Sequence, residues 1–431
     1  MILTQKPLLK TIIFAFVYLS LIPFAKALPV AKTPEEIGLS SSKLEAITEE
    51  LELLVNTRQI AGGVLTVIRN GKVGYRKTVG FSNLETEELI QVNDIFRIAS
   101  MTKIITGFAA YLLKQDNLID FNDPVSKYIE SYGSLKVLIP GKSGEASDFT
   151  TVTAKNQITI QHLLNHTSGL KAGISNSVSG NSATIGEAME KLVNIPLQFE
   201  PGSDFLYSNL NSDLLGYLIE VVSEQTLAEF FEARIFQPLE MKDTSFFVRE
   251  EKLDRLTTVY TPKNNNLKPL VNNADVFKQT YFSGGGGLYS TINDYSRFLQ
   301  MLLSQGQLIS KDGQTVIQVA DAKTVEEFLS IKPEDLEINP FFQQLLGGAS
   351  YRFTNGMAVK SAPSETVASI GAFKWFGAYS TYYFVDPKKE LIGILMTQIP
   401  FAPFLLQTNL INKFESLIYN SLCNNCQDVE P

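Results

Sequence analysis

The chain contains little cysteine, histidine or tryptophan, and each shortage limits its chemistry. Of 431 residues, two are cysteine, two are histidine and one is tryptophan. Cys423 and Cys426 form a C-x-x-C pair without a thioredoxin-like strand–motif–helix context, and zinc needs more ligands than this tail offers. The plain interpretation is a local disulfide. We expect no metal and no organic cofactor, and a core without further cysteine cross-links.

The missing motifs also narrow the enzyme classes. A Ser-His-Asp triad would have to use His162 or His166. The sequence has no G-x-S-x-G nucleophile elbow, no H-E-x-x-H zinc motif and no glycine-rich loop ending in Gly-Lys-Ser/Thr. An α/β-hydrolase, a zinc protease and a P-loop enzyme are therefore disfavoured. The run from His166 to Leu170 has the form of a structural helix end with a glycine stop.

An excess of positive charge is absent as well. The chain carries 45 acidic and 37 basic residues, which gives a net charge of −8 at pH 7. Nucleic acids and anionic lipids attract basic surfaces, so we expect no nucleic acid partner. Hydrophobic residues make up 44% and charged residues 19%, the balance of a globular chain with one large domain or two.

Long apolar runs are missing except near the N-terminus. Lys6 and Lys10 precede the apolar stretch 11–22, and residues 25–27 form an Ala-Lys-Ala cleavage motif. This is the pattern of a secretory signal peptide. A membrane anchor is the alternative, but Pro23 interrupts the run, which is short of the ~20 residues that a span needs. We favour cleavage after the motif, export to the periplasm or beyond, and no stable membrane span in the mature protein.

Periodicity predicts strands near both ends of the chain. Segments 60–68 and 73–80 are rich in β-formers and flank Asn70-Gly71, a strong hairpin signal. Strand patterns return from residue 350, and 384–396 predicts a second hairpin. Helical patterns lie at 40–57, 101–113, 120–132, 158–164, 182–193, 210–223, 227–236, 294–303 and 404–422.

This order of elements predicts an α/β (α+β) fold. We expect one antiparallel sheet, built from about 58–82 and 350–398 and flanked by helices. A mainly helical lobe, about 117–335, is inserted between the two parts of the sheet. Residues 140–156 lack periodicity and are predicted to form a surface loop.

A mostly apolar helix over 101–113 begins next to the first chemical candidate. Ser100 and Lys103 are three residues apart and share one helix face. A buried lysine that loses its charge can act as the base for a serine nucleophile, and a helix start favours an oxyanion. The same spacing recurs at Ser40–Lys43 and Ser168–Lys171. The alternative at Ser100 is a helix cap followed by a surface lysine.

Three further segments are candidates for a site. The chain has one Y-x-N motif, Tyr207-Ser208-Asn209, which precedes a predicted helix. The phenol of Tyr207 could pass a proton in catalysis. The alternative is a buried tyrosine beside an Asn209 that caps the helix. Residues 283–288 (Ser-Gly-Gly-Gly-Gly-Leu) predict a tight turn near a cleft. Residues 373–379 hold the only tryptophan, and strand alternation sets Lys374 opposite Trp375. A core aromatic cluster is the alternative there.

In their order along the chain, these motifs resemble the β-lactamase-related serine hydrolase family. That family includes class C β-lactamases, D-Ala-D-Ala carboxypeptidases and related esterases. The resemblance covers about residues 33–420, and it implies a single catalytic domain over 28–422, after a signal peptide at 1–27 and before a tail at 423–431. It further implies that Ser100 is the acylated nucleophile, that Lys103 and Tyr207 share the base and proton-relay work, and that Asn209 orients the substrate.

The family's third motif falls on Trp375-Phe376-Gly377. The resemblance implies an oxyanion hole formed by the backbone N–H groups of Ser100 and Ala378. Enzymes that act on β-lactams or peptidoglycan usually carry Lys-Thr-Gly or His-x-Gly here, which suits a substrate carboxylate. Related esterases carry Trp-Gly-Gly, which is more similar. Phe376 narrows the site if it points inward, and an aromatic wall favours apolar groups because burying an unpaired charge is costly.

The sequence therefore predicts an exported serine hydrolase that acts on small-molecule carboxylic esters with apolar groups. A first alternative is a β-lactamase or D-Ala-D-Ala carboxypeptidase with a β-lactam or peptidoglycan-like substrate. A second alternative is a non-catalytic relative that binds a peptide or lipid.

Overall fold

The computed structural model describes most of the chain after residue 27. The described residues are 28–140, 149–173, 178, 180, 182–263, 266–270, 280–309, 316–332, 335–346, 348, 350–364, 366–400, 404–423 and 426. The predicted signal peptide at 1–27 lies outside them, and so does most of the predicted tail.

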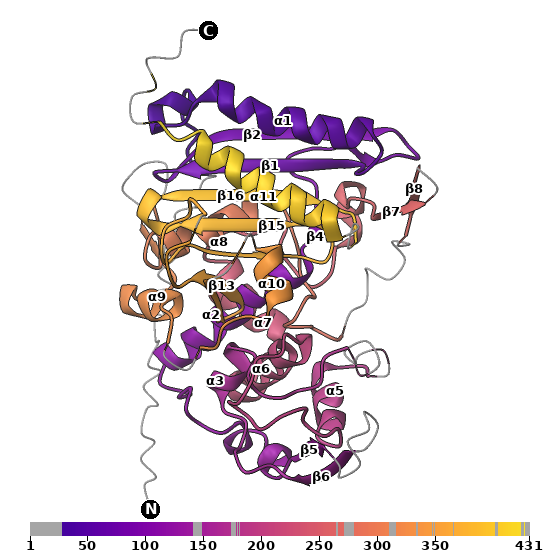
Figure 1. Ribbon diagram of the computed structural model, residues 1–431, viewed down its shortest axis with the longest axis vertical. Coiled ribbons are helices and arrows are strands. Elements are labelled where there is room, and N and C mark those ends of the chain that lie inside the picture. Colours follow the sequence, from indigo (N-terminus) through magenta and orange to yellow (C-terminus); the bar gives the residue numbers. More distant parts are fainter. Residues whose placement is uncertain are drawn as a thin grey trace, which may run out of the picture.

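One antiparallel sheet of eight strands organises the molecule (Figure 1). In spatial order the strands are β12 (Tyr351–Thr354), β13 (Met357–Lys360), β14 (Phe373–Phe376), β15 (Tyr382–Asp386), β16 (Leu391–Thr397), β1 (Gly62–Arg69), β2 (Lys72–Asn83) and β3 (Glu88–Leu89). The N-terminal β1 pairs with the C-terminal β16 from Gly63–Thr397 to Arg69–Leu391. The predicted sheet built from both ends of the chain is confirmed.

The β1–β2 hairpin forms where the sequence predicts it. Arg69 pairs with Lys72, so the loop contains only Asn70 and Gly71. Both residues have positive φ, 51° and 71°, as the favoured two-residue hairpin turn requires. The second predicted hairpin, β15–β16, also forms, with a 3₁₀ turn at Pro387–Lys389 between its strands.

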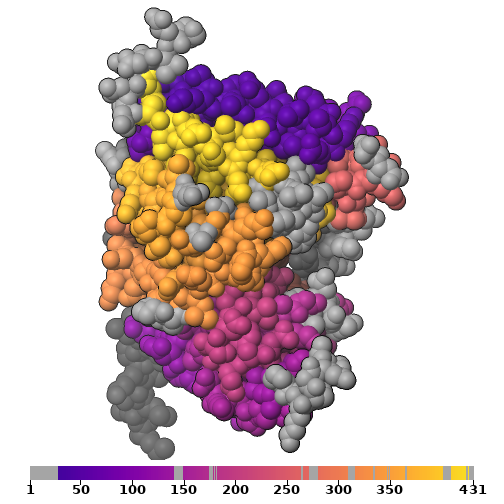
Figure 2. All heavy atoms as spheres, in the orientation of Figure 1, coloured from indigo at the N-terminus to yellow at the C-terminus, as the bar shows by residue number. Residues whose placement is uncertain are grey.

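Helices cover both faces of the sheet. The rings of Tyr382 and Phe414 are 6.3 Å apart, so Tyr382 faces α11 (Phe404–Asn420). Its neighbour Tyr383 points the other way, with its ring 5.6 Å from Tyr295 of α8 (Ile292–Leu303). Successive strand residues alternate between faces, so α11 and α8 lie on opposite sides. In Figures 1 and 2, α1 (Ser41–Asn56) lies beside α11, which brings the two ends of the described chain together.

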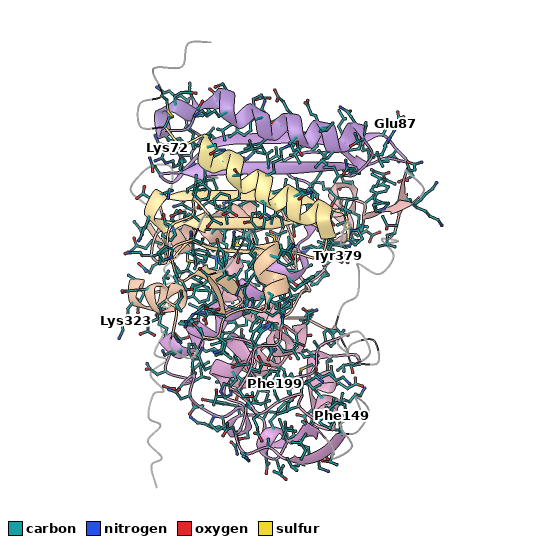
Figure 3. The ribbon with its side chains drawn as sticks, viewed as in Figure 1. Lys72, Glu87, Phe149, Phe199, Lys323 and Tyr379 are labelled. Atoms are coloured by element: carbon teal, nitrogen blue, oxygen red, sulfur yellow. A yellow bond between two sulfur atoms is a disulfide. The ribbon has the colours of Figure 1, made fainter. Side chains whose placement is uncertain are left out.

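A buried helix connects the sheet to the helical lobe. In α2 (Thr102–Gln115) every residue from Thr102 to Leu113 is buried, because the helix packs on the lobe helix α6 (Asn209–Ser223) and on α9 (Ala322–Leu329). Within the described residues, the lobe also contains α3 (Ile160–Leu164), α5 (Ile185–Leu192) and α7 (Leu227–Phe231). Figure 3 shows Lys72 on the sheet and Phe149 on the lobe at opposite ends of the molecule.

Two local predictions were wrong. The helix predicted at 120–132 consists of two 3₁₀ turns, Val125–Lys127 and Glu130–Gly133, because Pro124 is extended, with ψ 141°, and stands before the first turn. The surface loop predicted at 140–156 contains β6 (Phe149–Thr153), which pairs with β5 (Lys136–Pro140). The β-branched run within β6 is the overlooked signal.

Two smaller features complete the description. A disulfide joins Cys423 and Cys426, in agreement with the local-disulfide interpretation. Within the described part of the chain, none of the helices combines the length and apolar character that crossing a bilayer requires.

Candidate active site

Ser100 and Lys103 meet at the start of α2. Ser100 lies in a 3₁₀ turn, Ala99–Met101, which leads directly into the helix. Ala99 has a left-handed φ of 43°, so the chain turns sharply just before the serine. The Lys103 ammonium lies 3.0 Å from the Ser100 hydroxyl oxygen and has no exposed surface. The surface-lysine interpretation of this pair is therefore wrong.

The Lys103 ammonium uses all three of its donors. It donates to the Ser100 hydroxyl, to the Asn209 side-chain oxygen at 2.6 Å and to the Gly285 carbonyl. Its nitrogen also lies 4.9 Å from the centre of the Tyr207 ring. Three segments far apart in the sequence thus meet at one nitrogen: the start of α2, residues 207–209 and the glycine-rich loop.

Tyr207 and Asn209 reach this point because α6 begins between them. The Ser208 side chain accepts the Leu210 N–H and caps the helix. The alternative in which Asn209 caps the helix is therefore wrong. The side-chain oxygen of Asn209 is instead available to accept a hydrogen bond from Lys103. The Tyr207 hydroxyl accepts a hydrogen bond from the indole N–H of Trp375 at 3.1 Å. The tyrosine therefore connects the helical lobe to the third-motif strand.

The two histidines have supporting positions. Burial, and then the charge of Lys103, lower the pKa of His166 well below its usual value, so the ring is neutral. Its Nδ1 accepts the Ser208 N–H at 3.3 Å, and its ring stacks on Tyr207 at 5.1 Å. His162 takes part in the capping box of α3 with Thr159. Among the described residues no hydrogen bond joins either histidine to Ser100, which fits the structural interpretation.

The glycine-rich segment forms the predicted tight turn. The short strand β4 (Phe96–Arg97) pairs with β9 (Tyr289–Ser290), and the Ile98 N–H donates to the Leu288 carbonyl at 3.1 Å. This pairing sets the loop 283–288 beside the segment that carries the nucleophile. The loop contributes a backbone carbonyl, that of Gly285, rather than a side chain.

The third motif packs against the same segment. A Cβ atom at Gly377 would lie 2.4 Å from the Ile98 carbonyl oxygen, closer than real contacts allow. Glycine therefore permits the end of β14 to approach the chain two residues before Ser100. The backbone N–H groups of Ser100 and Ala378, predicted to form the oxyanion hole, come from the two segments that this contact brings together. Tyr379, labelled in Figure 3, follows directly on this strand end.

Lys374 lies on the other face of the sheet, as strand alternation predicted. Its ammonium donates to the Glu415 carboxylate on α11 at 2.9 Å, and only 3% of the side chain is exposed. The Tyr382 hydroxyl donates to the same carboxylate at 2.6 Å. The Lys374 ammonium, the cation next to the third motif, therefore forms a buried ion pair with Glu415 on the α11 face of the sheet.

Aromatic rings pack around the third motif. Trp375 is 5.2 Å from Tyr207 and 4.9 Å from Phe376, measured between ring centres. Phe342, from the short helix α10 (Pro340–Leu345), lies 4.9 Å from Tyr207, 5.6 Å from Trp375 and 6.3 Å from Phe376. We call Tyr207, Phe342, Trp375 and Phe376 the aromatic wall. The alternative of a core aromatic cluster holds in part, because Trp375 is fully buried.

Sequence reasoning missed three members of this region. Phe342 was not singled out, although Asn339-Pro340 is a helix-start signal, with Asn339 accepting the Phe342 N–H. The Gly285 carbonyl has no sequence signal of its own. Asp213 stands one turn after Asn209 on the same face of α6, and its carboxylate accepts the Gly285 N–H at 2.8 Å.

The antiparallel sheet flanked by helices, with a helical lobe and a buried lysine beside a serine, is the architecture of β-lactamase/transpeptidase-like serine hydrolases. The model of the Beta-lactamase family matches residues 45–415, and the chain belongs to that family. The predicted family and fold class are thereby confirmed.

Two curated relatives match most of the chain. A protein of Escherichia coli K12 named putative D-alanyl-D-alanine carboxypeptidase is 25% identical over 435 residues, 93% of this chain and 94% of its own. An uncharacterized protein of Mycobacterium tuberculosis is 28% identical over 360 residues, 79% of this chain and 86% of its own.

Two solved structures have the same fold. EstCE1, described as a hydrolase with promiscuous acyltransferase activity, has a TM-score of 0.69 at 22% identity and covers 88% of this chain and 98% of its own. Simvastatin synthase from Aspergillus terreus reaches 0.71 at 21% identity with the same coverage. At these identities the likeness concerns the fold alone.

Proposed function

We propose that this protein is an exported serine hydrolase that cleaves carboxylic esters with apolar groups through an acyl-enzyme on Ser100. The Ser100 oxygen attacks the ester carbonyl, and its proton passes to the relay formed by Lys103 and Tyr207. The relay returns the proton to the leaving alkoxide as the C–O bond breaks. Water then attacks the acyl-enzyme by the same route and releases the acid.

The contacts of Lys103 support this relay. Its bond to the Ser100 hydroxyl places a proton acceptor next to the nucleophile once the lysine is neutral. Asn209 accepts a hydrogen bond from the same ammonium, so its side chain lies beside the Ser100–Lys103 pair, which fits its proposed role in orienting the substrate. The backbone N–H groups of Ser100 and Ala378 would stabilise the oxyanion. A catalytically silent relative would not need this arrangement of buried donors and acceptors.

The observation that carries the substrate class is Trp375 within the aromatic wall. Its indole N–H donates to the Tyr207 hydroxyl, and its ring lies 5.2 Å from the Tyr207 ring. An aromatic side chain thus stands in the third motif, where the family resemblance implies a Lys-Thr-Gly or His-x-Gly sequence in enzymes that bind a substrate carboxylate. The neighbouring cation, Lys374, is paired with Glu415 behind the sheet. A carboxylate buried against aromatic rings would lack a partner, which costs several kcal/mol, whereas an apolar acyl or alcohol group would gain about 25 cal/mol per Å² buried.

A β-lactamase or D-Ala-D-Ala carboxypeptidase remains the second candidate. It is favoured by the name of the Escherichia coli relative, which matches nearly the whole chain. It would require a carboxylate partner other than Lys374, since that side chain faces Glu415.

A substrate panel tests the two candidates side by side. The mature protein from Leu28 would be assayed with p-nitrophenyl esters from acetate to octanoate and with a chromogenic cephalosporin. We expect ester turnover that improves beyond acetate, with little cephalosporin hydrolysis. Phe342→Ala should weaken the preference for longer chains about tenfold, because one ring of the wall is lost. Efficient cephalosporin turnover would overturn the aromatic-wall argument.

The chain supplies a matched control for that variant. Phe341 is the neighbour of Phe342 on α10, but 56% of its surface is exposed. Phe341→Ala removes the same number of atoms from the same helix, and we expect it to leave the chain-length preference within about twofold. If both variants changed the chain-length preference equally, the cause would be a disturbance of α10 rather than the loss of a ring from the aromatic wall.

Export is part of the same proposal. The residues that follow the proposed cleavage site pack on the sheet: Leu28 is buried, the Val73 N–H donates to the Pro29 carbonyl, and the Ala31 N–H donates to the Val73 carbonyl. A chain starting at Leu28 would therefore keep every contact of the described fold. The intact mass of the exported protein should correspond to a start at Leu28, in the periplasm or outside the cell; retention of residues 1–27 would favour a membrane anchor.

A further inference from the structure

A buried carboxylate lies directly behind the Ser100–Lys103 pair. Asp213 is on α6, four residues after Asn209, and only 3% of it is exposed. Residues four apart share a helix face, so both side chains point toward α2 and the glycine-rich loop. An aspartate is almost never buried to this degree unless its oxygens have partners, so its partners indicate its role.

All three side-chain partners of Asp213 belong to one loop. One oxygen accepts the Gly285 N–H at 2.8 Å and the Ser283 hydroxyl at 2.7 Å. The other accepts the Tyr281 hydroxyl at 3.2 Å. The Asp213 carboxylate therefore accepts three hydrogen bonds from residues 281–285 and attaches this loop to α6.

The position of Gly285 is what this attachment controls. A Cβ at Gly285 would lie 2.9 Å from the Asn209 carbonyl oxygen and 3.1 Å from the Asp213 carboxylate, so the loop backbone is pressed on α6. The Gly285 carbonyl accepts a hydrogen bond from the Lys103 ammonium. One residue earlier, the Gly284 carbonyl accepts the Thr106 hydroxyl at 2.7 Å. Gly285 thus links the two residues, because its N–H donates to Asp213 and its carbonyl accepts from Lys103.

We propose that Asp213 is a positioning residue that holds the Gly285 carbonyl against Lys103 and whose negative charge sets the proton affinity of the Lys103–Tyr207 relay. This rests on the proposed hydrolase function and deepens it. None of the hydrogen bonds of the Asp213 side chain goes to Ser100, so its effect is transmitted through the loop and through its electric field.

The charges around Lys103 give the sign of the effect. The groups that face it are Ser100 from the start of α2, Tyr207, Asn209 and Asp213 from α6 and its approach, His166 from the segment after α3, and the Gly285 carbonyl. His166 is neutral. Burial raises the pKa of Asp213, while Ser283, Gly285 and Lys103 oppose the rise. An ionised Asp213 stabilises the ammonium, so removing that charge makes the relay lose its proton at lower pH.

The test is the pH dependence of Ser100 labelling by a fluorophosphonate. This reaction needs a nucleophilic Ser100 but no particular substrate. Asp213→Asn keeps the shape and an acceptor for the Gly285 N–H but removes the charge. We expect the acid limb of its labelling rate to move to lower pH by at least about half a unit. An acid limb that coincides with that of the wild type would overturn the proposal.

One further variant separates the charge of Asp213 from its position. Asp213→Glu keeps the charge but moves the carboxylate by one methylene, so its acid limb should stay near the wild-type position while the maximal rate falls at least about fivefold. If Asp213→Asn fails to fold, Asp213→Glu still tests the positioning role. An unchanged maximal labelling rate in Asp213→Glu would refute that role. Wild-type protein that neither labels nor turns over esters would instead refute the proposed hydrolase, and the relay with it.

Asp294 provides the matched control. It is also buried, with 4% exposed, and its carboxylate also accepts a backbone N–H, from Asp243 at 2.7 Å, and a hydroxyl, from Thr244 at 3.1 Å. It stands at the start of α8, with no contact to the loop 283–288 among these bonds. Asp294→Asn should lower the unfolding temperature without moving the acid limb. An equal shift in both variants would mean that the effect follows from lost stability.

Discussion

Ser100→Ala should reduce ester turnover by at least about 10⁴-fold, to a rate close to the uncatalysed background. The Lys103 ammonium has three partners, and the other two, the Asn209 amide oxygen and the Gly285 carbonyl, are not nucleophiles. Removing the hydroxyl therefore removes the nucleophile that the proposed relay deprotonates. The measurement is steady-state release of p-nitrophenol from the butyrate ester. Turnover within tenfold of the wild type would remove Ser100 from the mechanism.

The sequence offers a control with the same motif. Ser40 and Lys43 repeat the S-x-x-K spacing at the start of α1, where the Ser40 hydroxyl lies 3.1 Å from that of Ser42. Ser40→Ala makes the same change in the same sequence context, far from Lys103. We expect full activity in this variant. The contrast with Ser100→Ala would show that activity depends on the surroundings of Ser100 and not on the S-x-x-K spacing itself.

Lys103→Ala should lower kcat/KM for esters by about 10³-fold or more, since a positioned base contributes about 10²–10⁴ and the groups of a relay fail together. The same change leaves the half-buried Asn209 side-chain oxygen and the buried Gly285 carbonyl without their shared donor, which costs about 1–3 kcal/mol for the buried carbonyl. Urea unfolding measured in parallel separates this loss of stability from the loss of rate.

Lys103→Arg distinguishes two roles of the lysine. A guanidinium keeps the positive charge but does not lose its proton near neutral pH. If Lys103 accepts the Ser100 proton, the arginine variant should be as inactive as the alanine variant. Recovery of activity in Lys103→Arg would mean that the charge alone matters, and it would assign the base to Tyr207.

Local patterns predicted the framework of the site because they act over short distances. The three-residue spacing of Ser100 and Lys103 places both on one face of a helix end. Asn70-Gly71 has both residues in the left-handed conformation that its turn requires. Strand alternation separated Lys374 from Trp375. Each of these depends on fewer than five consecutive residues.

What the sequence did not reveal depends on contacts between distant segments. Gly285 meets Lys103 across 182 positions, and the pairing of β4 with β9 sets their two segments side by side. Phe342 joins the aromatic wall through the placement of α10, which its cap alone does not determine. Asp213 gave a partial signal, as an acidic residue one turn after Asn209 in an otherwise mostly apolar helix. Its partners on the loop identify its role.

The most direct test of the account is to trap the acyl-enzyme. The mature protein would be mixed with p-nitrophenyl butyrate, quenched in acid during turnover, and analysed by intact mass and by peptide mapping, with Ser100→Ala and Ser40→Ala beside it. The account predicts one butyryl group per chain, located on Ser100, present in Ser40→Ala and absent in Ser100→Ala. A butyryl group on another residue, or one that persists in Ser100→Ala, would contradict it.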